Sequence, residues 1–376
     1  MKHDSISYLC DLLMYILLDS VEALSTQLMG HIAPLCLATI DLIAVPTARA
    51  VQTAKSKTPE DAPSEQLKLL IDPLDYLDLL QLFTVNCLSD DEALASFWSI
   101  LQYDFVLVML HRAQPLEQIM QMLQLLSTSI LPGSFGAIAG PRSSDATPTA
   151  SSVLSPRQPA NEAALIDRLT VLLFETPASL LAEANNNANS TSTIAKTILV
   201  LRTQVLTLLT QLAASTYGGK LLATHRTAFG RLVRFLHDAI LAMYDFFPEA
   251  IPDTAPSQDS PALGEAPFKT SHDHYTNHVN LTVLLLATLT DVPLPSPTDP
   301  STTTRMDVRS KLSAVPGGIA EKHLISLSRI AFADGLTAIE RGIDGDAADA
   351  AHRMLDELLS PEEGESVVEV FGGSAG

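Results

Sequence analysis

Apolar residues recur at helical spacing along most of this chain, and in several segments they cover more than one side of the predicted helix. The segment 194–214 has the most regular pattern, with one face formed by Ile194, Ile198, Leu201, Val205, Leu208 and Leu212. The segment 116–130 has a wider apolar surface, formed by Leu116, Ile119, Met120, Met122, Leu123, Leu125 and Leu126. A helix with two apolar sides needs a neighbour on each side, so this pattern predicts stacked helices.

Prolines, glycines and capping residues divide the chain into about a dozen predicted helices, most of them in neighbouring pairs. Asp72 before Pro73 and Ser360 before Pro361 are typical helix starts, because the first side chain can accept a bond from a free backbone N–H. Paired helices with wide apolar faces predict an all-α fold, a HEAT-like α-solenoid of stacked helix pairs with long loops rich in Pro, Ser and Thr. No fixed repeat length is visible, so a compact irregular helical domain is the alternative.

Polar and proline-rich segments indicate where the helical groups end. We expect N-terminal helical repeats over 1–130, a disordered loop over 131–160, middle helical repeats over 161–247, a disordered linker over 248–270 and C-terminal helical repeats over 271–371. The asparagine-rich run at 185–193 is predicted to be a further connector within the middle group.

Composition and charge narrow the possible functions. The formal net charge of −20 repels phosphate groups, so we do not expect the surface as a whole to bind DNA or RNA directly. Cys10, Cys36 and Cys87 lie singly in apolar helical stretches, a pattern typical of buried, reduced thiols. No apolar stretch reaches the uncharged length needed to cross a bilayer, so no membrane association is expected.

The His272–His278 cluster (HDHYTNH) is the motif that most suggests metal chemistry. His274 and His278 are one helical turn apart, a spacing that zinc sites use. The cluster has no glutamate between its histidines and no cysteine nearby, and Ser271 or Asp273 fits the N-cap of the apolar helix that follows. We therefore expect no enzyme, no metal and no cofactor; the alternative is a metal-binding helical protein or an enzyme that uses this cluster.

A run without Asp or Glu extends from Ala184 to His237. It contains six cations, which are Lys196, Arg202, Lys220, Arg226, Arg231 and Arg234. In a helix expected from about residue 225, Arg226 and Arg234 would project in similar directions, with Arg231 nearby. Lys220, Arg226, Arg231 and Arg234 are therefore candidate partner-binding residues for an acidic surface of a partner or of a second copy of the chain. A solvated helix face is the alternative.

Three stretches together resemble a known family. They are DFVLVMLHRAQPLEQIMQMLQLLSTSILPGSFG (104–136), LISLSRIAFADGLTAIERGID (324–344) and AHRMLDELLSPEEGESVVEVF (351–371). They resemble the C-terminal helical region of the ATR-interacting protein (ATRIP) family, in its fungal UvsD type. These proteins are regulatory subunits of the ATR-type DNA-damage checkpoint kinase.

The resemblance implies a HEAT-like solenoid, a nuclear location and a partner in the N-terminal helical repeats of the kinase, with a homodimer within the kinase complex as a further possibility. Family members also have an N-terminal segment that contacts RPA on single-stranded DNA, followed by a dimerising coiled coil. We see neither here, and the abrupt helical start suggests that upstream residues are missing. The chain is therefore expected to be the kinase-docking portion, without recruitment to RPA-coated DNA by itself.

Such a kinase favours Ser or Thr before Gln, and the chain has four of these pairs. Thr26, Thr203 and Thr210 lie in predicted helices, which an extended kinase cleft cannot accept. Ser257, before Gln258, lies in the proline-rich linker. Ser257 is therefore the candidate phosphorylation site.

Overall fold

The computed structural model describes residues 8–9, 11–15, 34–36, 38–39, 72–86, 103–129, 159–186, 191–245, 265–295, 303–313, 318–333 and 342–371. The contacts divide the chain into two compact units, Met1–Asn186 (unit 1) and Asn187–Gly376 (unit 2). The division falls within the asparagine-rich run that the sequence predicts to be a connector. The helices of the expected middle group, 161–247, are thus shared between the two units.

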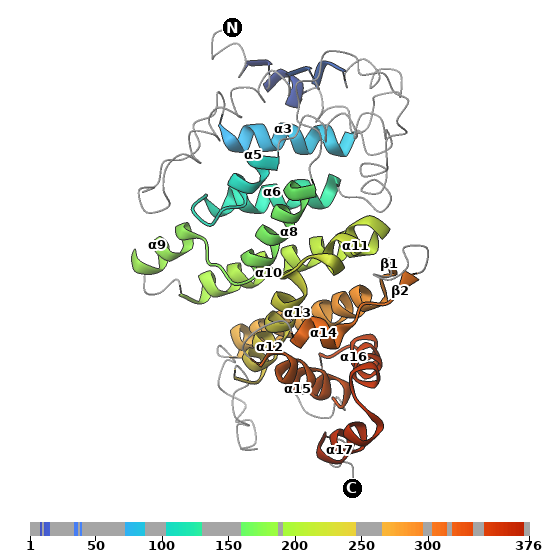
Figure 1. Ribbon diagram of the computed structural model, residues 1–376. Helices are drawn as coiled ribbons and strands as arrows, with labels where there is room; N and C mark the ends of the chain where they lie inside the picture. Colours follow the sequence, from blue (N-terminus) through green and yellow to red (C-terminus); the bar gives the residue numbers. More distant parts are fainter. Residues whose placement is uncertain are drawn as a thin grey trace, which may run out of the picture. The chain divides into compact units, whose positions relative to one another are not determined.

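Unit 1 contains the helices α3 (Pro73–Asn86), α5 (Tyr103–Met109), α6 (Leu116–Ser129), α8 (Pro159–Leu172) and α9 (Ala178–Asn186) (Figure 1). Helix α3 starts as predicted, because the Asp72 carboxylate accepts a bond from the Leu74 N–H at 2.9 Å and Pro73 needs no partner. Helix α5 packs against both α6 and α8, so residues on either side of the segment 131–158 lie in one packed group.

Helix α6 is covered on two sides, as its sequence predicts. It packs against α3 and α5. Its buried side chains include Ile119, Met122, Leu123, Leu125 and Leu126, whereas Glu117 and Gln124 are exposed. The buried residues span more than one stripe, so the excess of apolar residues is explained by two helical neighbours.

Unit 2 contains eight helices and a short strand pair among the residues that the structure describes. The helices are α10 (Thr191–Ala214), α11 (Thr216–Thr224), α12 (Ala228–Asp245), α13 (Glu265–Asp291), α14 (Val308–Ser313), α15 (Ile319–Ala331), α16 (Gly345–Leu358) and α17 (Pro361–Phe371). Strands β1 (Leu294–Pro295) and β2 (Thr303–Thr304) pair antiparallel, a short ladder that the sequence analysis did not predict.

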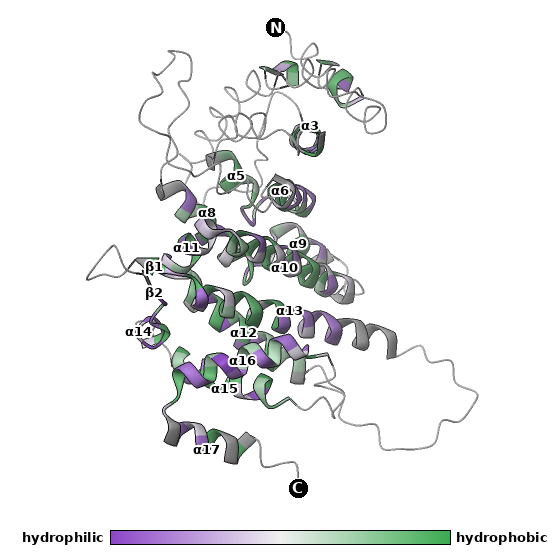
Figure 2. Ribbon diagram, turned by 90° about the vertical axis from the view of Figure 1, so that its right-hand side faces the viewer, coloured by the Kyte–Doolittle hydropathy of each residue, from purple (hydrophilic) through white to green (hydrophobic). Residues whose placement is uncertain are grey.

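Helix α13 organises the packing of unit 2. It contacts α10 and α12, and it also contacts α16 (Figure 1). Its C-terminal half is apolar and largely buried, whereas the turns that follow residue 271 are polar (Figure 2). Helices α15 and α16 pack on each other, and α15 also packs on α12. The later helices are thus attached to the α12–α13 pair.

Two helices begin earlier than the sequence predicts. Helix α8 starts at Pro159, so the last two residues of the expected loop are helical; the rest of 131–158 lies outside the described residues. Helix α13 starts at Glu265, so the end of the expected linker 248–270 is helical, and Ser271 and Asp273 lie within the helix rather than at its N-cap. Proline is tolerated in a first helical turn because its missing N–H would have no intrahelical partner there.

The junction between α10 and α11 depends on two glycines. A Cβ on Gly218 would lie 2.3 Å from the Leu212 carbonyl oxygen, and one on Gly219 would lie 2.9 Å from the Ala213 oxygen. Two adjacent glycines after a long helical pattern are typical of a helix end. Instead they lie inside α11, where Ser215 Oγ accepts a bond from the Gly218 N–H and caps the new helix.

Thr193–Ala214 in α10 is long and apolar enough to cross a membrane, judged by length and composition alone. In unit 2 this helix packs against α13 and α11, and its buried residues include Leu201, Val205 and Leu208. A core helix of a soluble protein has the same composition, so this stretch carries no argument for a membrane.

Candidate partner-binding surface

Helix α12 presents two of the predicted basic residues on its outer side. Its inner side is formed by Phe229, Leu232, Val233, Leu236, Ile240 and Met243, all buried as the sequence predicts. This face fixes the rotation of the helix, because the buried residues recur every three or four positions. Arg234 is therefore exposed and Arg231 is half-buried.

Lys220 and Arg226 lie outside that helix. Lys220 is half-buried in α11, and Arg226 is exposed in the turn before α12. The expected helix from residue 225 begins instead at Ala228. His225 Nδ1 accepts bonds from the backbone N–H groups of Thr227 and Ala228, at 3.4 and 3.2 Å, and so satisfies free donors at the helix start. Arg226 and Arg234 therefore do not share one helix face.

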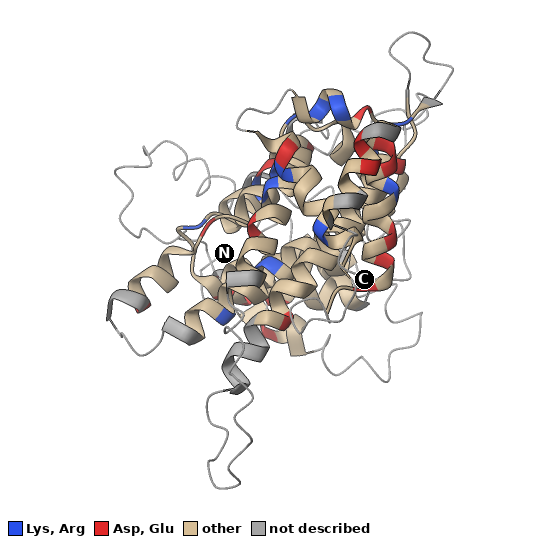
Figure 3. Cartoon of the chain, turned by 90° about the horizontal axis from the view of Figure 1, so that it is seen from below, with Lys and Arg blue, Asp and Glu red and all other residues tan. Residues whose placement is uncertain are grey.

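Asp238 interrupts the positive charge of α12. Its carboxylate lies 3.8 Å from Arg234 Nε, one helical turn away, and both side chains are more than half exposed. Such an exposed pair stabilises a helix by only about 0.3–0.5 kcal/mol. The run without Asp or Glu ends at His237, one residue before Asp238. Residues of both signs of charge occur over the described helices (Figure 3).

Helix α15 brings two cations beside α12 that the sequence analysis missed. His237 Nδ1 lies 3.2 Å from Ser326 Oγ, which joins the two helices. Burial lowers the pKa of His237, nearby Lys322 and Arg329 lower it further, and Asp238 opposes them. Lys322 and Arg329 are about ninety residues from His237 in sequence, so no local signal could have placed them there.

Ser257 lies outside the described residues. Its proposed role as a phosphorylation site therefore stays a prediction. Of the cysteines, Cys36 is described and is buried, as expected, whereas Cys10 and Cys87 are outside the described residues.

The His272–His278 cluster lies within the N-terminal half of α13. His278 is 1% exposed, and its Nε2 lies 3.0 Å from the Leu199 carbonyl oxygen and 2.9 Å from Thr203 Oγ1, both on α10. A carbonyl oxygen only accepts, so Nε2 carries the proton and donates. Burial lowers the pKa of His278 to about 4. Among the described residues, no three His, Cys, Asp or Glu side chains are arranged to hold a metal ion. The metal-binding alternative thus gains no support.

A buried amide attaches the C-terminal helices to α13. Asn280 Nδ2 donates to the Gly342 carbonyl oxygen at 2.8 Å, and its Oδ1 accepts from the Asp344 N–H at 3.2 Å. A Cβ on Gly342 would lie 2.4 Å from Thr276 Cγ2, so only glycine fits this approach without rearrangement. Lys311 adds a second attachment, because its ammonium donates to the Ala223 carbonyl oxygen near the end of α11.

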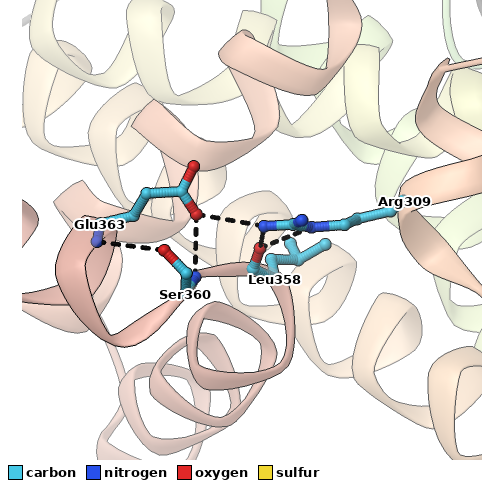
Figure 4. A network of polar contacts seen from close by, with 4 residues as sticks. All are labelled: Arg309, Leu358, Ser360 and Glu363. Atoms are coloured by element: carbon cyan, nitrogen blue, oxygen red, sulfur yellow. Dashed lines mark hydrogen bonds and ion pairs between the residues drawn. The ribbon is translucent and has the colours of Figure 1, made fainter.

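Arg309 holds the junction between α16 and α17 (Figure 4). Its guanidinium donates to the Leu358 carbonyl oxygen and, at 3.1 Å, to the Glu363 carboxylate. Glu363 also accepts from the Ser360 N–H at 2.8 Å, and Ser360 Oγ accepts from the Glu363 N–H at 3.3 Å. This reciprocal pair is a capping box, at the helix start that Ser360 and Pro361 predict. The Ser360 N–H is the largest cause of the lowered pKa of Glu363.

Comparison with protein-family models gives two matches along the chain. Residues 35–290 match the model described as Rad26-like, helical repeats, and residues 306–371 match the model described as Rad26-like, C-terminal domain. The attachments of Asn280 to Gly342 and Asp344 therefore join the two matched regions. A comparison with curated proteins gives no match.

A solved structure gives a second comparison. The chain is similar to a crystal structure of Rad26 from Myceliophthora thermophila, with a TM-score of 0.58 and 23% sequence identity, over 94% of this chain and 86% of that chain. At this identity the likeness shows the fold alone. Together with the helical-repeat model, it confirms the predicted all-α, HEAT-like α-solenoid fold class.

The family resemblance drawn from the sequence needs a correction. The models that match are Rad26-like, where the sequence analysis named the ATR-interacting protein family in its UvsD type and only its C-terminal helical region. The quoted stretches consist of packing and capping patterns, which recur in many helical proteins and do not separate one family from another. Because the helical-repeat model alone spans more than half of the 376 residues, the chain belongs to the Rad26-like family.

Proposed function

We propose that the chain is a non-catalytic regulatory subunit that binds the N-terminal helical repeats of an ATR-type checkpoint kinase in the DNA-damage and replication-stress response. Membership of the Rad26-like family, over both the helical repeats and the C-terminal domain, is the observation that carries this proposal. A stack of helices offers extended side-chain surfaces to a protein partner, which suits a scaffold. The proposed location is the nucleus.

The proposal assigns no direct contact with nucleic acid to this chain. Its net charge of −20 opposes binding to phosphate backbones, so RPA-coated single-stranded DNA would be reached only through an N-terminal region not seen here. A homodimer within the kinase complex is part of the same proposal. Ser257 is the proposed target of the bound kinase, because a permanent partner meets it at high effective concentration.

Affinity capture from a nuclear extract tests the proposal. The tagged chain is expected to recover an ATR-type kinase subunit, identified by its peptides, in amounts well above those on a control column. The control column carries an unrelated helical-repeat protein with the same tag and a similar net charge, because a strongly acidic bait collects basic proteins without specificity. Failure to enrich this kinase at both low and moderate salt contradicts the proposal.

The Ser257 assignment has its own test. Phosphopeptide mapping is expected to detect phosphate on Ser257 in cells after DNA-damage treatment. The phosphate is expected to be absent when the same treatment is given together with an inhibitor of the kinase. The Ser257→Ala variant controls for phosphate at neighbouring positions such as Ser260. An unmodified Ser257 under all conditions removes this part of the proposal without affecting kinase binding.

A further inference from the structure

The outer face of α12 carries a cation and an apolar residue in one line. Arg234, Asp238 and Leu241 are four and then three residues apart, which places them on the same side of the helix. The Arg234 side chain is 65% exposed and Leu241 is 40% exposed. Leu241 therefore leaves apolar surface in water although the opposite side of the helix is fully packed.

The outer face of α15 repeats this combination. Lys322, Ile325 and Arg329 are three and then four residues apart and also share one side of their helix. Ile325 is 43% exposed, and the two cations are half-buried. A cation thus lies one turn before and one turn after an exposed isoleucine.

The two faces belong to neighbouring helices. Helix α12 packs against α15, and the 3.2 Å contact between His237 and Ser326 lies between the two lines of residues. Ser326 follows Ile325 directly, and His237 is one turn before Leu241. Packed helices lie about 8–10 Å apart, so the exposed side chains of both helices can contact one ligand.

The charge of this area differs from that of the whole chain. Three cations and two carboxylates, those of Asp238 and Glu321, lie in this area, so its net charge is positive in a chain whose net charge is −20. Among the described residues of unit 2, the large exposed apolar side chains are Val200, Leu241, Ile325 and Val370, and two of these four lie in this area. Apolar anchors beside an excess of one sign of charge are typical of surfaces that bind a complementary protein segment.

We propose that Arg234, Leu241, Lys322, Ile325 and Arg329 form a docking surface, the α12–α15 surface, for an acidic amphipathic helix of a partner protein. The apolar side of such a helix would cover Leu241 and Ile325, and its Glu or Asp residues would lie beside the three cations. The identity of the partner, an ATR-type kinase, rests on the proposed function. The chemistry of the docking segment, an acidic amphipathic helix, does not. This surface differs from the patch predicted from the sequence, since Lys220, Arg226 and Arg231 lie outside it.

A synthetic peptide tests the chemistry directly. The probe is a fluorescent amphipathic helix of Glu and Leu residues, and a scrambled peptide of the same composition is the control. The wild-type chain is expected to bind the helical peptide, more weakly as salt rises. The triple variant Arg234→Glu, Lys322→Glu, Arg329→Glu is expected to lose at least about tenfold in affinity, because like charges repel across the contact. Leu241→Ser with Ile325→Ser tests the apolar anchors and is expected to weaken binding at all salt concentrations.

A matched variant separates this surface from a general charge effect. Lys196→Glu, Lys220→Glu, Arg226→Glu makes the same change in net charge on other parts of unit 2 and is expected to leave peptide binding within about twofold of wild type. Circular dichroism and melting of both triple variants check that the fold is intact. Equal binding by wild type and the α12–α15 triple variant overturns the inference, as does equal loss in the two triple variants.

Two further results distinguish this inference from the proposed function. If wild type captures the kinase and the α12–α15 triple variant captures it equally well, the inference fails while the proposed function stands. If wild type captures no kinase but binds the peptide in a surface-dependent way, the proposed function fails while the surface chemistry stands. If the triple variant instead abolishes self-association in sedimentation and does not change peptide binding, a second copy is the occupant and the inference is wrong.

Discussion

Buried threonines donate to carbonyl oxygens of their own helix in both units, and unit 2 also has buried polar side chains that bond between helices. In unit 1, Thr39, Thr84 and Thr170 each donate to the carbonyl oxygen four residues earlier. In unit 2, the buried polar side chains that join separate helices or a loop to a helix include His278 with α10, Asn280 with Gly342 and Asp344, and Ser326 with His237.

His323 extends this difference. It is 0% exposed in α15, beside the ring of Phe229, and neither of its ring nitrogens has a hydrogen-bond partner. Burial lowers its pKa to about 4. A hydrogen bond from a side chain to the backbone of its own helix needs only that helix to form. A hydrogen bond between two helices needs the tertiary packing as well. Unit 2 is therefore expected to respond more strongly to acid and to single polar substitutions.

The largest expected effect comes from the apolar core of unit 1. Leu123→Asp places a charge on a side chain that is 2% exposed and covered by helices on two sides, which is expected to cost on the order of 4 kcal/mol or more. Thermal melting measures the loss of stability. Hydrogen exchange should show increased exposure in α3 and α6. Unchanged melting and unchanged exchange in α6 would mean that this face is not buried.

Acid should weaken unit 2. The folded-state pKa values of His278 and His323 are both about 4, below the usual 6.5, so the unfolded chain binds protons more readily between these values. The contribution of each histidine to the free energy of unfolding is therefore fully present above about pH 6.5. It is lost as the pH falls towards 4, by about 3 kcal/mol for each histidine.

His323→Leu tests this effect. The substitution is expected to reduce the loss of stability between pH 7 and pH 5, because it removes the imidazole that takes up a proton on unfolding. It gives up no hydrogen bond of the ring. His352→Leu, at a half-buried position of α16, is the control. Thermal melting at both pH values measures the difference. The same pH dependence in wild type and His323→Leu would show that His323 does not contribute.

A pair of conservative substitutions compares a bond between segments with a local one. Asn280→Leu removes both bonds to the segment before α16 and is expected to cost about 2 kcal/mol, because the Gly342 and Asp344 backbone groups lose their partner. Thr84→Val removes one bond within α3 and is expected to cost about 1 kcal/mol or less. Denaturant unfolding measures both. A larger loss for Thr84→Val contradicts the comparison of the two units.

The smallest effect is expected from the segment between α6 and α8. Replacing residues 133–156 by a short Gly/Ser linker should change the free energy of unfolding by about 1 kcal/mol or less, because loop-closure entropy varies only with the logarithm of loop length. Melting of the shortened chain checks this. A large drop in melting temperature would show that the segment takes part in the packing of unit 1.

The helices and their buried faces follow from the sequence because both depend on neighbours within a few residues. The six-residue stripe of α10, the double burial of α6, the Asp72 cap and the Ser360–Glu363 capping box need only helical spacing and local hydrogen bonds. The helix starts at Pro159 and Glu265 were missed, because a proline near a helix start resembles a proline in a loop.

The candidate surface was only partly predictable. The spacing of charges along the chain identified Arg234, but it grouped this residue with Arg231, which is not part of the surface. It also added Lys220 and Arg226, which the break at His225 keeps off α12. Lys322 and Arg329 join the area because α15 packs on α12, and that pairing depends on how apolar faces fit between distant segments. The sequence by itself determined which residues of each helix face inward, since this is a property of local spacing. The tertiary structure alone decided which outward residues share a surface, because that depends on contacts between residues that lie far apart in the chain.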